Sequence, residues 1–361
     1  MTGARPALPE PVFDHLRRLT DSIGLHEHAL GDVPRPEHGY CVDDAARALV
    51  LTCRAADPAL DELTGRYLNV VLAAIEPDGQ CHNRLGLTGK WLDSPGLGDW
   101  WGRAVWALGV TAARGPAWAR PRALSGFNQL AHQRSPWVRA MAYACLGAAE
   151  LVATAPQARW LLVAAVSVVR GAEAITTPAS PAGWAWPEAR LRYDNARLPE
   201  ALLAAGSALN RPELVKSGLE QLRFLLAVET TAGHLSVTPV AGRGPGEHGP
   251  AFDQQPIDVA GIADACSRAW SLTGDQAWLA GIRLAWAWFD GSNDAEIAMY
   301  DPDTGAGYDG LEADGRNFNR GAESTIAALT TLIQARTAGA DECPPPSRTI
   351  RTSTSSPISN G

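Results

Sequence analysis

Carboxylates occur together with aromatic or histidine side chains in five separate segments of this sequence. The segments cover about residues 38–44, 82–101, 184–197, 234–258 and 300–323. A pair of carboxylates can supply a proton donor and a base or nucleophile, which cleavage of a glycosidic bond requires. Aromatic faces suit the apolar C–H faces of sugars. The five segments therefore indicate a carbohydrate site, provided that the fold brings them together.

Three carboxylates are the candidates for catalysis. Glu188 lies between Trp186 and Tyr193, outside any expected helix and without an evident structural role, so we predict that it is the general acid. Asp44 and Asp194 are the candidates for the base. Both lie where a helix is expected to begin, and a helix N-terminus can also explain an Asp without catalysis. The two explanations stay open at this stage.

Other polar and aromatic residues of the five segments are candidates for binding the sugar. They are expected to orient hydroxyl groups, to tune the pKa values of the catalytic pair or to stack on sugar rings. Asp43 has helix capping as an equally weighted alternative. The predicted binding residues are His38, Tyr40, Asp43, Asp99, Trp100, Trp184, Trp186, Arg197, Asp253, Gln254, Asp258, Asn317 and Glu323.

Two other functions remain open. His38, His82, His234 and His248 would suit a sugar epimerase or isomerase, which moves a proton with histidines. A glycan-binding protein without catalytic activity is the third hypothesis. Motifs for a dinucleotide, a nucleoside triphosphate, a catalytic zinc or a serine nucleophile are not found in the sequence. We therefore predict no cofactor and no metal.

The elements that must position these residues are helices. Windows rich in Ala, Leu and Val recur with helical periodicity between Pro, Gly, Asp and Asn, and strand signals are few. The expected helices cover about residues 11–22, 43–56, 59–75, 100–114, 117–132, 135–154, 157–172, 195–209, 211–229, 255–272, 275–290 and 320–337.

The links between these helices alternate in length. Links after the even-numbered helices are short, and most links before them are long: 23–42, 76–99, 173–194, 230–254 and 291–319. Such alternation puts the long links at one end of an antiparallel assembly. The even helices are apolar nearly all round and suit an inner ring. We therefore predict an all-α (α/α)6 toroid as one domain over residues 1–337, followed by a disordered Pro/Ser/Thr-rich tail over 338–361.

Composition narrows the partners and the compartment. The 361 residues carry a formal net charge of −8, with no basic cluster, so nucleic acid and anionic membrane are not expected as partners. No apolar run approaches the roughly 20 residues of a membrane span. The first residues do not resemble a signal peptide, which predicts a cytoplasmic protein. The six scattered cysteines are expected to be reduced and mostly buried.

Four motifs resemble those of a bacterial family. They are HGYCVDD at residues 38–44, YDNARLP at 193–199, QQP at 254–256 and RGAES at 320–324. Over about residues 35–335 the chain is similar to bacterial glycosidase-like all-α domains, which occur alone or fused behind glycosyltransferase domains. The resemblance implies an (α/α)6 toroid, a carbohydrate substrate and a functional link to a glycosyltransferase. The family pattern has a Glu-Asp pair where Gly98 and Asp99 stand, which keeps the non-catalytic hypothesis open.

Overall fold

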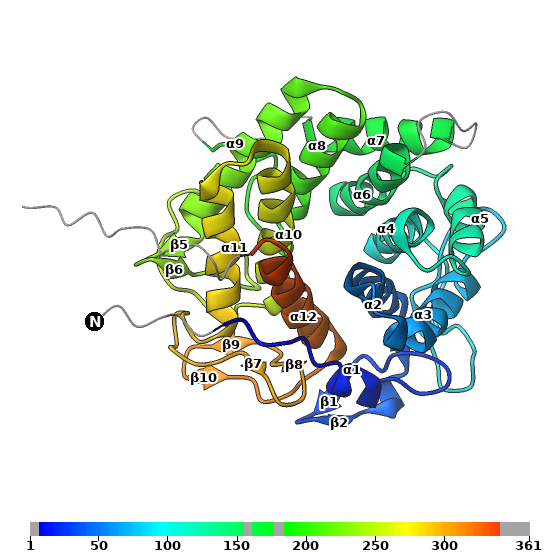
Figure 1. Ribbon diagram of the computed structural model, residues 1–361, viewed down its shortest axis with the longest axis horizontal. Coiled ribbons are helices and arrows are strands. Elements are labelled where there is room, and N and C mark those ends of the chain that lie inside the picture. The colour runs from blue at the N-terminus through cyan, green and yellow to red at the C-terminus, as the bar shows by residue number, and fades with distance from the viewer. Residues whose placement is uncertain (1–6, 155–160, 177–183, 340–361) are drawn as a thin grey trace, which may run out of the picture.

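The computed structural model describes residues 7–154, 161–176 and 184–339. Its helices form two concentric rings (Figure 1). In the inner ring each helix packs against the next, and the last returns to the first, so the ring is closed. The inner helices are α2 (Val42–Ala55), α4 (Asp99–Arg114), α6 (Val138–Thr154), α8 (Arg197–Ala208), α10 (Pro256–Thr273) and α12 (Ala322–Thr337).

The outer ring consists of the odd-numbered helices. Helices α3, α5, α7, α9 and α11 each pack against the inner helix that precedes them, and α1 packs against α12. Their bounds are α1 (Asp14–Arg18), α3 (Asp61–Ala73), α5 (Arg120–Leu130), α7 (Leu161–Thr176), α9 (Pro212–Val228) and α11 (Gln276–Phe289). The (α/α)6 toroid predicted from the alternating links is confirmed, with the even helices inside.

Glycines let the inner helices α4 and α6 approach closely. A Cβ atom added to Gly109 of α4 would lie 2.3 Å from the carbonyl oxygen of Gly147 on α6. A Cβ atom added to Gly147 would in turn lie 2.5 Å from the Val105 carbonyl oxygen. Only residues without a side chain fit this contact. Small residues on these two helices therefore set the width of this part of the ring.

Short hairpins brace the long links. Five two-stranded antiparallel sheets are found in the described residues, each with strands of two residues. Strands of two residues are too short for an alternating apolar pattern, so they were not predicted from the sequence. The pairs are β1 (Ala29–Leu30) with β2 (Val33–Pro34), β3 (Tyr40–Cys41) with β4 (Arg84–Leu85), β5 (Thr230–Thr231) with β6 (His234–Leu235), β7 (Tyr300–Asp301) with β8 (Ala306–Gly307), and β9 (Leu311–Glu312) with β10 (Gly315–Arg316).

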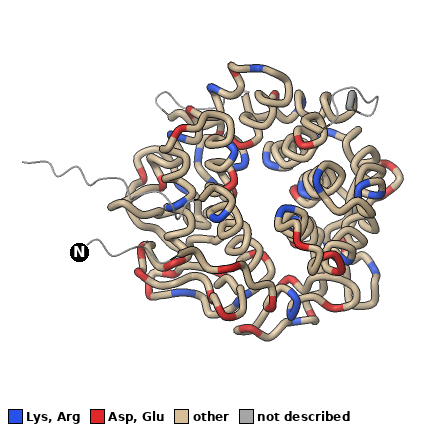
Figure 2. Tube along the Cα trace, in the orientation of Figure 1, with Lys and Arg blue, Asp and Glu red and all other residues tan. Residues whose placement is uncertain are grey.

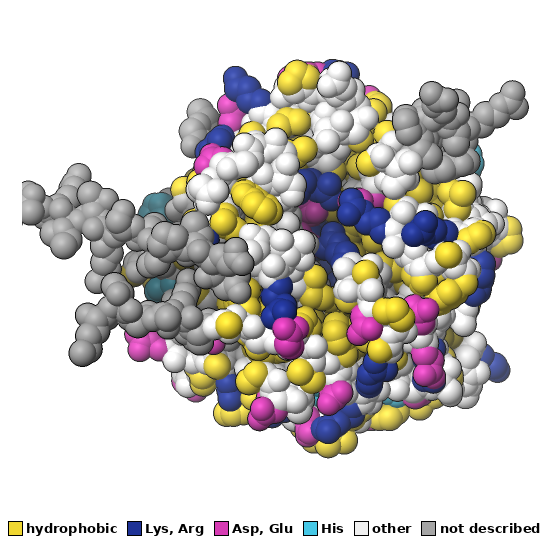
Figure 3. Space-filling view, in the orientation of Figure 1, with side chains coloured by type: hydrophobic (Ala, Val, Ile, Leu, Met, Phe, Trp, Pro, Cys, Tyr) yellow, Lys and Arg dark blue, Asp and Glu magenta, His cyan; other side chains and the backbone are white. Residues whose placement is uncertain are grey.

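Apolar side chains fill the space between the two rings, while charged side chains gather in the central opening. Figure 2 shows Lys and Arg positions on inner helices around that opening, and Figure 3 shows a central hollow in one face where basic and acidic side chains meet. The five described cysteines are buried and free. Of the helices described, none has the length and apolar character needed to cross a bilayer. Residues 340–361, most of the expected tail, lie outside the described residues, so the predicted tail stays a prediction.

Candidate active site

A cavity of about 880 Å³ opens at the N-terminal ends of the inner helices. Its walls include residues from the first turns of four inner helices, namely Asp43 of α2, Asp99 of α4, Arg139 of α6 and Glu323 of α12. The links before α2, α4 and α8 add further lining residues: Glu27, Cys41, Asn83, Gly98, Glu188, Arg192 and Tyr193. Four of the five sequence segments thus contribute to one cavity. The fourth segment, residues 234–258, contributes no lining residue.

Helix geometry favours carboxylates in these positions. Asp43, Asp99 and Glu323 each stand in the first turn of an inner helix. The N-terminal end of a helix carries a partial positive charge, which stabilises a nearby carboxylate. The closed ring directs several such ends at the same cavity. A cluster of acidic groups is therefore tolerated there.

Asp43 is held as an ionised carboxylate. Its Oδ1 accepts a hydrogen bond from Arg103 Nη1 at 2.6 Å, and its Oδ2 accepts one from Asn83 Nδ2 at 3.1 Å. Burial favours the neutral acid, but the positive charges of Arg103 and Arg47 outweigh that effect and lower the pKa of Asp43.

Asp99 has the opposite character. Burial raises its pKa, the nearby charge of Arg103 only partly offsets that rise, and the negative charge of Asp43 adds to it. No described residue donates a hydrogen bond to its carboxyl group. Two carboxyl groups on adjacent inner helices, α2 and α4, therefore face one cavity with their pKa values moved apart. Such a pair can divide the roles of base and acid.

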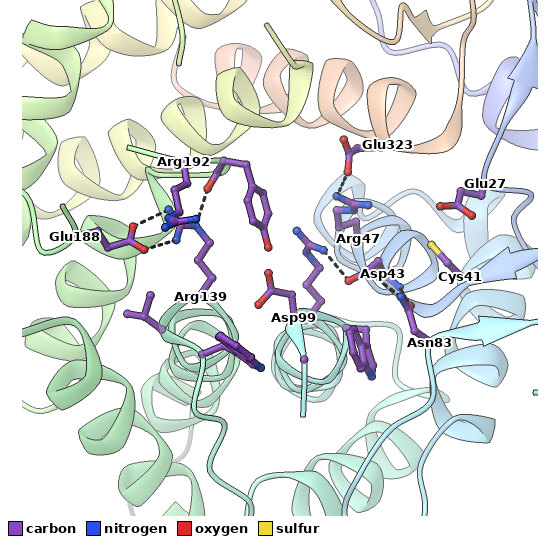
Figure 4. A pocket seen from close by; sticks show the side chains of 16 residues that line it. Glu27, Cys41, Asp43, Arg47, Asn83, Asp99, Arg139, Glu188, Arg192 and Glu323 are labelled. Atoms are coloured by element: carbon purple, nitrogen blue, oxygen red, sulfur yellow. Dashed lines mark hydrogen bonds and ion pairs between the residues drawn. The ribbon is translucent and has the colours of Figure 1, made fainter. Parts of the chain in front are cut away.

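Glu188 forms a bidentate ion pair with Arg139. Both of its oxygens accept hydrogen bonds from the guanidinium, each at 2.8 Å (Figure 4). Arg139 also donates to the Tyr193 carbonyl oxygen at 2.6 Å and to Asn195 Oδ1 at 3.1 Å. A carboxylate that accepts from arginine with both oxygens is ill suited to hold a proton for the leaving group. This geometry speaks against the predicted role of Glu188 as the general acid.

Asp44 and Asp194 lie beneath the cavity and do not line it. Asp44 Oδ1 accepts from Arg47 Nη2 at 2.6 Å, and its Oδ2 accepts from the Cys41 thiol at 3.1 Å. Asp194 is 1% exposed, and its Oδ2 accepts from the Tyr143 hydroxyl. Neither side chain caps the helix that follows it. Of Asp43, Asp44 and Asp194, only Asp43 lines the cavity.

Trp100 is the one predicted stacking residue that lines the cavity, and its indole Nε1 donates to the Cys81 carbonyl oxygen at 2.6 Å. Trp184 and Trp186 are buried instead. Their ring centroids lie 4.9 and 6.3 Å from that of Phe224, so they pack within the core. The stacking role expected of these two rings does not fit this placement.

The remaining predicted binding residues have structural partners or lie away from the cavity. Tyr40 donates to Asp21 at 2.6 Å, and Gln254 donates to Asp294 at 2.6 Å. Asn317 accepts from the backbone of the same link. His38 and Asp253 are exposed, and Arg197 and Asp258 are buried below the cavity. None of these residues lines the cavity.

Asp258 belongs to a buried pair of acids. Burial raises its pKa well above the usual range, and the neighbouring Glu229 raises it further. Burial also raises the pKa of Glu229 to about 7, although the Thr238 hydroxyl and backbone N–H donate to its carboxyl group. The Asp258 Oδ1 atom has no hydrogen-bond partner. Asp258 is therefore a buried acid whose pKa is raised, and it does not line the cavity where the sequence analysis expected it to bind the sugar.

Arginines are the lining residues that the sequence analysis missed. None of them was among the predicted site residues, yet Arg47, Arg103, Arg139 and Arg192 all line the cavity. Figure 4 shows the pair of Glu188 and Arg139 on one side, Asp43 and Arg47 on the other, and Asp99 between them. Arg47 donates to Glu323 at 2.5 Å, whereas Arg192 is exposed at the rim. For Arg47, Arg103 and Arg139, the sequence signal that could have revealed them is a charged residue on an otherwise apolar inner helix.

Several solved structures align with this chain over most of its length. A sugar epimerase from a ruminal bacterium aligns with a TM-score of 0.67 and 13% identity, over 91% of this chain and 97% of that chain. Cellobiose 2-epimerase from Bacillus thermoamylovorans aligns at 0.69 and 11%, over 90% and 96%. The GH76 α-mannanase of Bacteroides thetaiotaomicron aligns at 0.59 and 11%, over 89% and 92%. The chain has their (α/α)6 toroid fold. No family model and no curated protein sequence matches it.

No histidine of this toroid lines the cavity, although His28 Nε2 lies 3.7 Å from Oε2 of the lining residue Glu27. All eight histidines fall within the described residues. His82 stacks on Trp91 at 5.1 Å and pairs with Glu76, while His234 pairs with Asp294 at 2.8 Å. The predicted pair of catalytic histidines is therefore not brought together at this site.

One group of potential metal ligands borders the cavity of the toroid. Atoms of Glu27, Cys41 and Asp44 lie within 4.8 Å of one another. Each acid already has a cationic partner, Arg84 for Glu27 and Arg47 for Asp44. Burial raises the pKa of the Cys41 thiol, so it keeps its proton. Because these charges are balanced, we assign no metal to the group.

Proposed function

We propose that the protein is a glycoside hydrolase that binds an oligosaccharide in the cavity at the N-terminal ends of its inner helices. The observation that carries the proposal is that Asp43 and Asp99 line one cavity from the first turns of adjacent inner helices, where Arg103 and Asn83 donate hydrogen bonds to Asp43 and no described residue donates one to Asp99. Protonated Asp99 would donate its proton to the leaving oxygen. Ionised Asp43 would activate water or attack the sugar carbon. Both residues were expected to bind substrate, and we propose the catalytic roles for them instead.

Other lining residues suit the recognition of a sugar. Trp100 lies partly buried in the wall, and Trp137 is 63% exposed at the cavity. Their faces offer platforms for sugar rings. Asn83, Glu188 and Glu323 present polar atoms for hydroxyl groups. A cavity of about 880 Å³ is within the range of known ligand sites.

A sugar epimerase or isomerase is the second candidate. The fold likeness to a sugar epimerase and to cellobiose 2-epimerase favours it. In this chain such a reaction would have to move its proton with Asp43 and Asp99, because the histidines lie elsewhere. A non-catalytic glycan-binding role is the third candidate. The functional link to a glycosyltransferase stays a prediction from the family resemblance.

Product analysis separates these candidates. Wild-type protein, Asp99→Asn and the exposed control Asp303→Asn would be incubated with a panel of oligosaccharides and free sugars and followed by NMR. We expect new reducing ends with wild type and the control, and none with Asp99→Asn. Free sugars converted to an epimer or isomer would favour the second candidate. Binding without any product, in all three proteins, would favour the third.

A further inference from the structure

A chain of polar contacts continues from Asp43 into the centre of the toroid. Arg103 of α4 donates from Nη1 to Asp43 at 2.6 Å and from Nη2 to the Tyr143 hydroxyl at 2.9 Å. The Tyr143 hydroxyl, on α6, donates in turn to Asp194 Oδ2 at 2.5 Å. Arg103 therefore joins a carboxylate at the cavity to two buried groups below it.

Asp194 is fixed in place from several sides. Its backbone has a φ of +44°, which few residues other than glycine adopt. A Cβ atom added to Gly261 of α10 would lie 2.5 Å from Asp194 Oδ1, so the glycine leaves room for the carboxylate. Arg197 lies 3.3 Å from Asp194 and donates to Asp264 at 2.6 Å. The position of Asp194 is thus determined by its own backbone, α10 and α8.

Tyr143 contacts Arg103 in two ways. Its hydroxyl accepts the guanidinium N–H, and its ring lies 4.7 Å from the guanidinium carbon. Tyr143 itself is fully buried. A buried arginine that keeps its charge needs acceptors, and cation–π contact adds to their effect. The hydroxyl and the ring therefore restrict where the Arg103 charge can lie.

We propose that Tyr143 and Asp194 are positioning residues that hold the Arg103 guanidinium beside Asp43 and Asp99, and so determine which of the two carboxyl groups carries the proton. The inference rests on the proposed roles of Asp43 and Asp99 in catalysis. It assigns Asp194 an indirect role, in place of the direct one expected from the sequence. Tyr143 has no role in the reaction as described above.

The charged and titratable groups that face this cluster come from every inner helix around it. They add to the field at Asp43 and Asp99, and each must stay unchanged when Tyr143 or Asp194 is altered. These groups are Arg47 of α2, Arg139 of α6, Arg197 of α8 and Asp258 of α10, with Glu323 of α12 paired to Arg47.

We expect variants of the two positioning residues to shift carboxyl pKa values in opposite directions. In Tyr143→Phe, Arg103 loses an acceptor and is held less firmly at Asp43, so the pKa of Asp43 rises by about 1. In Asp194→Asn, the shape and the positive φ are kept while a negative charge is lost. Since that charge raises the pKa of Asp99, its pKa falls in this variant. Loss of the Asp194 charge lowers the pKa of Asp99 even without positioning, so the rise at Asp43 in Tyr143→Phe is the shift that a purely structural role would not produce.

The test is a carboxyl titration of the full chain. Asp side chains would be labelled with ¹³C at the carboxyl carbon and followed by NMR, with Asp43→Asn and Asp99→Asn to assign the signals. Tyr67→Phe is the matched control, because Tyr67 is also buried and hydrogen-bonded, to Thr20 at 2.8 Å, but lies on the outer helix α3. This control should leave both pKa values unchanged.

The titration tests the inference without any measurement of enzymatic turnover. A higher pKa for Asp43 in Tyr143→Phe, together with a lower pKa for Asp99 in Asp194→Asn, supports it. Unchanged values, or the same shifts in Tyr67→Phe, overturn it. The titration needs no substrate, so a protein that cleaves no oligosaccharide would overturn the proposed hydrolase and leave this result readable. If Tyr143→Phe does not fold, the pKa of Asp43 in Asp194→Asn decides: loss of the charge alone would lower it and overturn the inference, whereas release of Arg103 through Tyr143 would raise it and support the inference.

Discussion

Glu188 and Arg139 join two distant parts of the chain with paired hydrogen bonds of 2.8 Å each. Arg139 lies in the first turn of the inner helix α6, and Glu188 lies in the long link before α8. The arginine is 6% exposed and the glutamate 19%, so water screens the pair only partly. A bidentate ion pair of this kind fixes the relative orientation of its two side chains and also stabilises their contact. The pair therefore holds the third long link against the wall of the cavity.

Replacing Glu188 with glutamine should weaken the enzyme without stopping it. The glutamine can still accept one hydrogen bond from Arg139, while the charge of the pair is lost. We expect kcat to fall by about tenfold, against roughly 10²- to 10⁴-fold for removal of a general acid in Asp99→Asn. Steady-state kinetics on the same oligosaccharide would compare the two variants. If Glu188→Gln were as inactive as Asp99→Asn, Glu188 would be the acid after all.

The rate should depend on pH through Asp43 and Asp99. Activity needs Asp43 ionised and Asp99 protonated, so kcat/KM should be highest between their two pKa values. Arg103 lowers the first pKa below 3.8, and burial raises the second above 3.8. We therefore expect a bell-shaped profile with an acidic optimum and a loss of activity as pH rises through the pKa of Asp99. A rate that increases up to neutral pH would contradict this assignment.

The architecture could be predicted from the sequence because it depends on local signals. Helix periodicity and the alternating links indicated the two rings, and the first-turn positions of Asp43 and Glu323 followed from them, whereas Asp99 was expected at the end of a link and begins α4 in the structure. The ionisation of each carboxylate depends on partners that are distant in sequence. Glu188 and Arg139 are 49 residues apart, and no spacing rule joins them. Chemistry at the site was therefore less predictable than its location.

Burial explains why residues of the fourth long link do not line the cavity, as the sequence analysis had expected. The fourth long link was expected to bring Asp253, Gln254 and Asp258 to the cavity. In the structure Gln254 is fully buried and bonded to Asp294, and Asp258 shares a buried environment with Glu229. Polar residues in a link can serve its own packing as well as a ligand. Sequence alone does not distinguish these uses.

The free energy of unfolding should decrease with rising pH because of Glu229. Its pKa is raised to about 7 in the folded protein, against 4.5 as the reference value. Between these values the folded state binds more protons than the unfolded state, so stability is present at lower pH and is lost as pH rises through the folded pKa. Urea unfolding at about pH 5 and about pH 8 should differ by roughly 1–3 kcal/mol.

Two variants check that this loss belongs to Glu229. Glu229→Gln removes the titrating group and should reduce the difference between the two pH values. Glu220→Gln makes the same chemical change at an exposed side chain and should leave the difference as in wild type. An equal pH dependence in wild type and Glu229→Gln would show that another group is responsible.

Alanine at Gly109 should destabilise the toroid strongly. Its Cβ atom would lie 2.3 Å from the Gly147 carbonyl oxygen, and backbone cannot move aside as a flexible side chain can. Helices α4 and α6 would have to separate, at a cost of about 2 kcal/mol or more. Gly65→Ala on the outer helix α3 is the matched control, because its Cβ would meet only a Trp118 ring atom at 3.5 Å. Alanine favours a helix there, so this variant should gain about 0.5–1 kcal/mol. Urea unfolding would measure both, and equal stabilities for the two variants would mean that the ring is not limited by the contact between α4 and α6.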